Sequence, residues 1–457
     1  MAKFLSKVKN IYLIGIGGVG MSGLALLLRE RGFRVFGSDC SDFSLMKMLR
    51  KKNIEVLIGH KRANIRSDID LVGYSSAIGE NNPEMIEAKQ RGITILNKGK
   101  LLAELCSDSK AIAISGSHGK TTTTSLTGYL LMSLGYKPSV FLGGTSLNYS
   151  QGAWWGSDYF VIEADESDKS FLDYKPYFSI ITNIDKEHLD GYKNMNNLRN
   201  TFLKFASQTK EKVFGWGDQD YVRQIISAAK GWSFGKGEHN IVRAANLNCH
   251  NDCSTFDLYI RNKFVIAIKT PLLGEYNCFN TLGALAFFAY LGEDLKKVNK
   301  VLMQFKGTKR RFNIKAKVDD VTFVDDYAHH PTEIKSVLGA ARLKKPKRIV
   351  AVFQPHRFSR VKLLIKEFTK CFEEADVLIV TDIYSAHEKP VKGLDAKELM
   401  KKIKNNFSGE LYYTSKDKLP KVVSSHCKSG DIVLGLGAGD INILMEQAVN
   451  EFRKARA

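Results

Sequence analysis

A glycine- and threonine-rich segment in the first third of the chain carries residue types suited to phosphate chemistry. An apolar run at residues 111–114 leads into Ser-Gly-Ser-His-Gly-Lys at residues 115–120, followed by four threonines. Glycines let backbone N–H groups converge on one point, and a helix that begins there adds its positive end. Lys120 adds a mobile charge for the outer phosphates, and the hydroxyl of Thr121 or Thr122 can hold Mg²⁺. The segment therefore predicts a phosphate-binding loop, with an ordinary strand-to-helix turn as the alternative.

Two polar clusters follow the next predicted strands and can supply ligands for a metal ion. Residues 163–168 place four carboxylates directly after an apolar run, and residues 182–190 place another mixed cluster after the following run. Mg²⁺ takes few protein ligands and completes its shell with phosphate oxygens and water. We predict Glu163 as the first ligand and His188 as a further one. The alternative for each cluster is a polar loop without a metal.

A second glycine-rich turn lies near the N-terminus. Residues 15–20 read Gly-Ile-Gly-Gly-Val-Gly, follow an apolar run at residues 11–14, and have Asp39 a suitable distance downstream. This pattern alone suggests a dinucleotide enzyme, but the same turn serves any diphosphate because its amides and helix dipole recognise the anion. A chain with both glycine turns is expected to bind two different nucleotides.

The last third of the chain contains two segments rich in histidine, aspartate and arginine. Residues 325–331 hold two aspartates and two histidines, which could form a metal site, although adjacent residues usually point apart. Residues 353–360 hold Arg357 and Arg360, three positions apart after a predicted strand. Guanidinium groups grip a small carboxylate in bidentate fashion, so these arginines suit a carboxylate ligand; the alternative is a solvated helix face.

Composition limits the classes of protein to consider. The chain has 457 residues, 44% hydrophobic and 25% charged, with a formal charge of +20. The lysines are spread without interleaved aromatic residues, so we predict solvated faces and no nucleic-acid partner. Seven scattered cysteines favour a reducing compartment, and Cys249 and Cys253 lack a second pair of zinc ligands. With no signal-peptide core and no apolar helix long enough for a bilayer, we predict a cytoplasmic protein without membrane insertion.

The apolar runs divide the chain into three blocks of alternating strands and helices. Each block begins with a strand, a turn and a helix, which favours α/β domains with mainly parallel sheets. We predict a Rossmann-like domain at residues 1–107, a P-loop-type nucleotide-binding domain at residues 108–312 and a second Rossmann-like domain at residues 313–457. Residues 213–270 are rich in strand and turn signals and are predicted to form a β-rich insertion in the central domain.

With these motifs in this order, the chain resembles the Mur ligases of peptidoglycan synthesis, and among them the members that join L-alanine to UDP-N-acetylmuramate. The likeness covers nearly the whole chain and is strongest at residues 15–23, 116–124, 163–168, 325–331, 354–360 and 382–384. In that family the phosphate loop is shorter than the common one, which accounts for Ile114 at the position of the usual first glycine. The resemblance implies three domains, for the UDP-sugar, for ATP and for the incoming amino acid.

The resemblance also implies the residues of each site. UDP-N-acetylmuramate is expected at Gly15, Gly17, Gly18, Gly20, Ser38, Asp39, Ser75 and Ser76. ATP is expected at Gly116, Ser117, His118, Gly119, Lys120, Thr121, Thr122, Asn277, Asn280, Arg311 and Asp326, with Tyr276 where the family usually has histidine. The Mg²⁺ or Mn²⁺ ligands are expected to be Thr121, Glu163 and His188, and the L-alanine pocket Tyr327, His329, Arg357 and Arg360. The catalytic residues are expected to be Lys120, His188, His329 and Arg311.

The activity implied is ATP-dependent ligation of L-alanine to the muramyl carboxylate through an acyl phosphate, by a monomer or weak homodimer whose domains close around the substrates. The nearest alternative is the recycling ligase that joins a preformed tripeptide to the same sugar. Ser167 favours the alanine-adding members, because the recycling ligases tend to have tyrosine there. More distant alternatives are a non-catalytic nucleotide-regulated binding protein and an NAD-dependent oxidoreductase.

Overall fold

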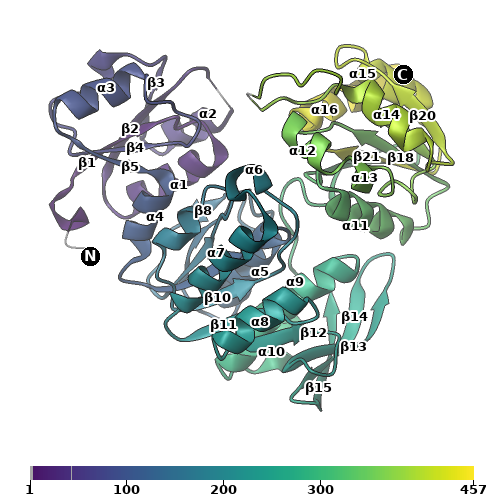
Figure 1. Ribbon diagram of the computed structural model, residues 1–457, viewed down its shortest axis with the longest axis horizontal. Coiled ribbons are helices and arrows are strands. Elements are labelled where there is room, and N and C mark those ends of the chain that lie inside the picture. The colour runs from purple at the N-terminus through teal and green to yellow at the C-terminus, as the bar shows by residue number, and fades with distance from the viewer. Residues whose placement is uncertain (1–3, 43, 387, 457) are drawn as a thin grey trace. The chain divides into compact units, whose positions relative to one another are not determined.

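The computed structural model describes residues 4–42, 44–386 and 388–456 and contains three β-sheets in chain order (Figure 1). The chain forms two compact units. The first unit consists of Met1–Asn246, Phe256–Ile268 and Phe279–Lys306, and the second of Leu247–Thr255, Lys269–Cys278 and Gly307–Ala457.

The first sheet has five parallel strands in the order β3-β2-β1-β4-β5. Alternate residues of β1 enter different cores: Ile11 and Leu13 pack with α1, whereas Tyr12 and Ile14 pack with Met85 of α3. Both faces of the sheet are therefore buried, as a parallel sheet requires. The strands are β1 (Asn10–Ile14), β2 (Arg34–Asp39), β3 (Glu55–Ile58), β4 (Leu71–Tyr74) and β5 (Thr94–Asn97). The helical elements are η1 (Leu5–Lys7), α1 (Val19–Glu30), α2 (Ser44–Lys51), η2 (Arg62–Asn64), α3 (Pro83–Gln90) and α4 (Lys98–Cys106).

The second sheet has ten strands in the order β15-β14-β13-β12-β11-β10-β6-β9-β7-β8. The phosphate loop follows β6, which pairs in parallel with β10 on one side and β9 on the other. The strands are β6 (Lys110–Ser115), β7 (Ser139–Phe141), β8 (Ala153–Trp154), β9 (Tyr159–Glu163), β10 (Phe178–Ile181), β11 (Lys212–Trp216), β12 (Trp232–Gly235), β13 (Val242–Cys249), β14 (Ser254–Ile260) and β15 (Lys263–Thr270). The helical elements are α5 (Lys120–Ser133), η3 (Ser170–Asp173), α6 (Leu189–Tyr192), α7 (Met195–Ser207), α8 (Asp220–Ala228), α9 (Glu275–Tyr290) and α10 (Leu295–Leu302).

The segment predicted as a β-rich insertion continues this sheet at one edge. Strands β11 and β12 extend the parallel ladder from β10, and β13, β14 and β15 follow in sheet order. The segment also contains α8, which the strand-rich pattern did not predict. Helix α9, predicted from residue 281, begins six residues earlier at Glu275, so both Asn277 and Asn280 lie in its first two turns.

The third sheet has the order β16-β17-β21-β18-β19-β20, parallel except for β16. The loops after β17, β18 and β19 leave the same edge of the sheet, because carboxyl ends of parallel strands share an edge. The strands are β16 (Asn313–Val318), β17 (Val321–Asp326), β18 (Arg348–Phe353), β19 (Val377–Val380), β20 (Glu410–Tyr413) and β21 (Asp431–Leu436). The helices are α11 (Pro331–Arg342), α12 (Phe358–Leu363), α13 (Ile365–Phe368), α14 (Ala396–Lys404), α15 (Leu419–His426) and α16 (Ile441–Lys454).

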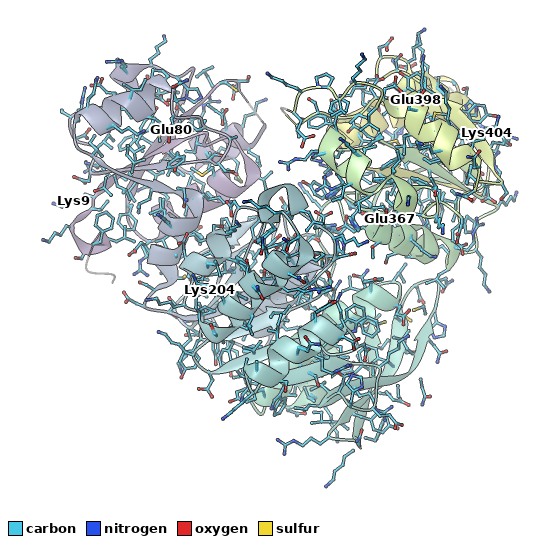
Figure 2. The ribbon with its side chains drawn as sticks, viewed as in Figure 1. Lys9, Glu80, Lys204, Glu367, Glu398 and Lys404 are labelled. Carbon is cyan, nitrogen blue, oxygen red and sulfur yellow. The ribbon has the colours of Figure 1, made fainter. Side chains whose placement is uncertain are left out.

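The three sheets confirm the predicted α/β fold class. Helix α4 ends at Cys106 and β6 begins at Lys110, so the predicted boundary after residue 107 lies between the elements of the first two sheets. The exact domain boundaries at residues 107 and 312 stay predictions. Lys9, Lys204 and Lys404 are exposed, in line with solvated lysine faces (Figure 2). Within the described ranges, every helix is too short or too polar to cross a bilayer.

Candidate active site

The phosphate loop has the backbone conformation that its glycines predict. Gly116 has φ +136° and Gly119, the N-cap of α5, has φ +83°, both in the region that side chains rarely adopt. A Cβ on Gly116 would lie 2.8 Å from the carbonyl oxygen of Asn183. Any larger residue at Gly116 would therefore strain the backbone and collide with the loop after β10.

The polar cluster after β10 holds the phosphate loop in place. The amide of Ser117 donates to the carbonyl of Asn183 at 3.0 Å, and the amide of His118 donates to the Asn183 side chain at 3.0 Å. The ring of His118 lies 3.2 Å from Asp185, and Thr182 donates to the His118 carbonyl at 2.6 Å. His118 and Ser117 thus shape the loop, a supporting role that their prediction as ATP contacts did not include.

Lys120 is held at the centre of the loop by a buried acid. Its ammonium donates to Glu166 at 2.9 Å and to the Gly116 carbonyl at 2.6 Å. Burial lowers the pKa of Lys120, but the charges of Glu166 and Asp165 outweigh it and raise the pKa above the usual range. Burial raises the pKa of Glu166 to about 7 against the opposing charge of Lys120. Lys120 therefore stays charged while it is pre-placed beside the loop.

Thr121 and Glu163, two of the predicted metal ligands, are in direct contact. The Thr121 hydroxyl donates to Glu163 Oε1 at 2.8 Å, and the amide of Gly143 donates to Glu163 Oε2 at 2.7 Å. A Cβ on Gly143 would lie 2.9 Å from Glu163 Oε1, so a larger residue there would push this carboxylate aside. Hydroxyl and carboxylate oxygens are hard donors of the kind that Mg²⁺ or Mn²⁺ takes. The residues present fit such an ion; Thr122, the other threonine considered, is buried beside Thr121.

His188 lies beside Glu166, the acid that holds Lys120. Its Nε2 is 3.8 Å from Glu166 Oε1 and 3.3 Å from Glu187. The residue has φ +56°, a left-handed conformation at the start of α6 that aims the ring toward the Lys120–Glu166 pair. The structure therefore joins two of the three predicted metal ligands directly, and the role of His188 as the third stays a prediction.

Of the two predicted asparagines on α9, Asn280 reaches the phosphate loop. A Cβ on Gly119 would lie 2.9 Å from the Cγ atom of Asn280, so this side chain packs on the loop at the start of α5. Asn277 lies one turn earlier on α9 and donates to the Leu273 carbonyl at 2.9 Å. The neighbouring Tyr276, which replaces the usual histidine, precedes Asn277 in the same turn.

Several backbone amides of the N-terminal glycine turn donate hydrogen bonds to residues of the same domain. The amides of Gly15 and Ile16 donate to the Ser38 carbonyl at 2.8 and 3.0 Å, and the amide of Gly17 donates to Asp39 Oδ2 at 2.8 Å. Asp39 Oδ1 also accepts from the amide of Cys40 at 2.8 Å. Gly15, Gly17, Ser38 and Asp39 therefore build the turn, and the binding of a diphosphate there stays a prediction.

The remaining residues predicted for the UDP-sugar lie around this turn. Gly18 is the N-cap of α1 and Gly20 lies in its first turn. Ser75 follows β4 and lies 3.1 Å from where a Cβ on Gly15 would be, whereas Ser76 is exposed. The order of the strands reverses between β1 and β4, and such a switch point forms the ligand crevice of open α/β sheets.

In the second unit, Asp326 is buried in a structural role. Its two oxygens accept from the amides of Phe312 at 2.6 Å and Ala328 at 2.7 Å. Burial raises the pKa of Asp326 to about 6, although the charge of Arg311 opposes the shift. Asp326 fixes the entry to β16 and the loop after β17, and its expected contact with the nucleotide stays a prediction.

The loop after β17 gathers Tyr327, His329 and Arg311. The guanidinium of Arg311 lies 5.2 Å from the centre of the Tyr327 ring, and the rings of Tyr327 and His329 meet edge to face at 5.3 Å. Glu333 of α11 lies 3.7 Å from Arg311 and 3.6 Å from His329. Arg311 and His329 thus share one anionic partner, and the Tyr327 ring lies against both of them.

The loops after β18 and β19 complete this group. His356 stacks on Tyr384 with ring centres 5.5 Å apart and lies 5.6 Å from the His329 ring. Arg360 contacts His356 Nδ1 at 3.1 Å, and the Arg357 guanidinium lies 4.0 Å from Glu388. The predicted amino-acid residues Tyr327, His329 and Arg360 are therefore linked through ring contacts, and Arg357 lies in the same loop with an acidic partner.

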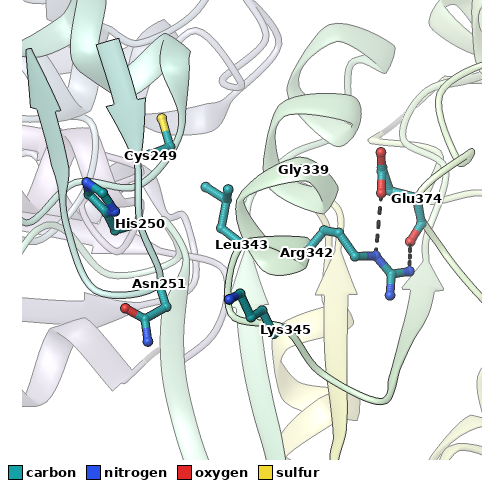
Figure 3. Close-up of a pocket in the computed structure, with 8 residues that line it drawn as sticks. All are labelled: Cys249, His250, Asn251, Gly339, Arg342, Leu343, Lys345 and Glu374. Carbon is teal, nitrogen blue, oxygen red and sulfur yellow. Dashed lines mark hydrogen bonds and ion pairs between the residues drawn. The ribbon is translucent and has the colours of Figure 1, made fainter. Parts of the chain in front are cut away.

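A cavity of about 590 Å³ lies elsewhere in the second unit. It is bounded by the turn between β13 and β14 and by the end of α11, where Arg342 pairs with Glu374 at 3.4 Å (Figure 3). Cys249 lines it, whereas Cys253 is buried and its carbonyl accepts from the His250 amide, as in a simple hairpin turn. None of the predicted site residues lines this cavity.

Three residues of the site were not predicted. Glu166 was one of four candidate carboxylates, and only its burial against Lys120 distinguishes it. Glu333 occupies the third position of a capping box at the start of α11, a pattern that the sequence shows but that does not reveal its contacts with Arg311 and His329. His356 was part of a motif, and its contacts depend on the separate loop of Tyr384.

Comparisons with known proteins cover nearly the whole chain. Residues 10–110 match the model "Mur ligase family, catalytic domain", residues 114–288 the Mur ligase middle domain, and residues 310–439 the Mur ligase glutamate ligase domain. The chain is 38% identical over 445 residues to the UDP-N-acetylmuramate–L-alanine ligase of Carboxydothermus hydrogenoformans, covering 95% of each protein.

Solved structures show the same arrangement of the fold. The UDP-N-acetylmuramate-alanine ligase MurC from Thermotoga maritima is 29% identical with a TM-score of 0.85, over 98% of this chain and 100% of that one. A murein peptide ligase from Psychrobacter arcticus shares the fold at 23% identity and a TM-score of 0.72, over 97% and 98% of the two chains. The three family models and the full-length relatives confirm the resemblance, and the chain belongs to the Mur ligase family.

Proposed function

We propose that the chain is an ATP-dependent ligase that joins L-alanine to the carboxylate of UDP-N-acetylmuramate in peptidoglycan precursor synthesis. The observation that carries the proposal is the charged Lys120 in a phosphate loop beside the Thr121–Glu163 pair, in a chain that matches alanine-adding relatives over 95% of its length. Intact phosphate-binding groups argue against a non-catalytic binding protein. The glycine turn near the N-terminus is assigned to the sugar nucleotide and not to NAD.

The first step activates the carboxylate. A carboxylate is a poor electrophile, so one lactyl oxygen attacks the γ-phosphorus of ATP, the bond to the β,γ-bridging oxygen breaks, and ADP leaves. Lys120 exchanges its bond to Glu166 for the transferring phosphoryl group and stabilises the charge that moves to the leaving oxygen. Thr121 and Glu163, with His188 nearby, would hold Mg²⁺, which neutralises phosphate charge when bound.

The second step forms the amide. The neutral amine of L-alanine attacks the acyl phosphate, a tetrahedral intermediate collapses, and inorganic phosphate leaves with one former carboxylate oxygen. Arg357 and Arg360 are assigned to the carboxylate of L-alanine, which bidentate guanidinium groups suit. His329 Nδ1 contacts the Tyr327 carbonyl at 2.9 Å. A carbonyl only accepts, so in the neutral ring Nδ1 carries the proton, and we assign the basic nitrogen Nε2 to accept the amine proton.

A cytoplasmic location is part of the same proposal. All seven cysteines are free thiols, and five of them are buried. Unpaired cysteines in this number are typical of a reducing compartment. A monomer or weak homodimer stays a prediction.

The proposal is tested by offering competing amine substrates. With UDP-N-acetylmuramate and ATP, phosphate release is expected with L-alanine and at least about 100-fold less with the murein tripeptide, because a pocket built for a small side chain rejects a larger ligand. The product is identified by mass spectrometry. Faster ligation of the tripeptide would establish the recycling activity instead, and phosphate release that needs no sugar nucleotide would refute both. NAD is expected to leave the melting temperature unchanged.

A further inference from the structure

A fully buried carboxylate lies behind the N-terminal glycine turn. Glu84, in the first turn of α3, has no exposed surface. It accepts hydrogen bonds from Tyr12 at 2.9 Å, from Asn64 at 2.6 Å, from Ser38 at 2.7 Å and from His60 Nδ1 at 2.8 Å. A buried carboxylate is costly unless such donors satisfy it, and the positive end of α3 also favours the charge. One side chain therefore ties β1, β2 and the loop after β3 to α3.

Two of these four hydrogen bonds connect Glu84 to the glycine turn, one through Ser38 and one through the Gly59–His60 loop. The Ser38 carbonyl accepts from the amides of Gly15 and Ile16, and its hydroxyl donates to Glu84. His60 lies next to Gly59, whose amide donates to the Asp39 carbonyl at 2.7 Å, and Asp39 in turn holds Gly17. Ser38 itself is fully buried, so it does not present its hydroxyl to a ligand. The chain of contacts runs from Glu84 through Ser38 and His60 to both sides of the turn.

We propose that Glu84 is a positioning residue for UDP-N-acetylmuramate, holding the glycine turn in its binding geometry through Ser38 and the Gly59–His60 loop. The inference rests on the proposed function for the identity of the sugar nucleotide. Because a carboxylate only accepts, His60 donates from Nδ1, so Glu84 also sets the tautomer of this ring and leaves Nε2 as its acceptor nitrogen. The Tyr12 bond reaches Glu84 from β1 without touching the turn, and it supplies a matched control.

The test compares Glu84→Gln and Ser38→Ala with Tyr12→Phe in the full chain. Calorimetry measures the Kd of UDP-N-acetylmuramate, and phosphate release measures kcat and both KM values. Glu84→Gln and Ser38→Ala are expected to raise the Kd and KM of the sugar nucleotide about tenfold, the scale of one lost buried hydrogen bond, with kcat and the KM of ATP within about twofold. Tyr12→Phe is expected to lower the melting temperature without changing the Kd.

A double variant separates positioning from direct contact. If Ser38 acts only through Glu84, the Ser38→Ala, Glu84→Gln double variant binds the sugar nucleotide as weakly as either single variant; if Ser38 contacts the ligand itself, the two effects add and the proposed path is wrong. A Kd for Glu84→Gln within about twofold of that for Tyr12→Phe would overturn the proposal. If Glu84→Gln does not fold, the Kd of Ser38→Ala is compared with that of Tyr12→Phe instead, and the same twofold limit applies. Binding without ligation in the unmodified chain would refute the proposed function and leave this test intact.

Discussion

Replacing Lys120 by alanine is expected to lower the kcat of phosphate release at least about a thousandfold. Removing a preorganised donor at a developing oxyanion costs about two to three orders of magnitude in rate, and Lys120 carries a full charge aimed from inside the loop. A coupled phosphate-release assay at saturating UDP-N-acetylmuramate and L-alanine measures the effect. Turnover near that of the unmodified chain would show that Lys120 does not contact the reacting phosphates.

The control for this variant must account for Glu166. Alanine at position 120 leaves Glu166 buried without its cation, which destabilises the fold independently of catalysis. Glu166→Gln removes the same ion pair but keeps the charge of Lys120. We expect its melting temperature to fall as in Lys120→Ala, while its kcat falls much less. Equal losses of kcat in both variants would assign the Lys120 effect to structure.

Replacing Glu163 by alanine is expected to lower kcat about a hundredfold and to raise the Mg²⁺ concentration needed for half-maximal rate. Glu163 is the carboxylate that accepts from Thr121, and the amide of Gly143 orients its other oxygen. Loss of one of few protein ligands weakens metal binding strongly, because Mg²⁺ relies on one or two carboxylates. A Mg²⁺ titration of phosphate release measures both effects.

An acidic residue of the same motif provides the comparison. Asp168 is exposed, and its carboxylate accepts from the nearby Ser170 amide at 2.9 Å. Asp168→Asn is therefore expected to keep the Mg²⁺ dependence of the unmodified chain. If Glu163→Ala also keeps that dependence, Glu163 is not a metal ligand, and the pairing with Thr121 only supports the phosphate loop.

The sequence predicted most of the turns and polar motifs that lie directly after a strand. Glycine turns after β1 and β6, the acidic motif after β9 and the segments after β17 and β18 all follow apolar runs, and parallel sheets bring such ends to one edge. Local pattern suffices there, because the position of a residue along its own strand decides where it emerges. The α/β class and the phosphate loop were predicted on this basis and agree with the structure.

The roles that sequence could not assign depend on contacts between distant segments. Both oxygens of Asp326 accept from backbone amides, those of Phe312 and Ala328, and its predicted contact with the nucleotide stays a prediction. Asp39 and Ser38 fit a ligand-binding pattern, yet they hold the glycine turn, and Ser38 donates to Glu84 46 positions away. A motif specifies residue types at a spacing, whereas only packing determines whether a polar atom faces a ligand or a backbone amide.

The central claim is that ligation proceeds through an acyl phosphate made from the sugar carboxylate, and isotope transfer tests it most directly. UDP-N-acetylmuramate labelled with oxygen-18 in its lactyl carboxylate is incubated with the chain, ATP, Mg²⁺ and L-alanine, and the released phosphate is analysed by mass spectrometry. The mechanism predicts one labelled oxygen in each phosphate and a UDP-N-acetylmuramoyl-L-alanine product that retains the other. Amide product accompanied by unlabelled phosphate would contradict it.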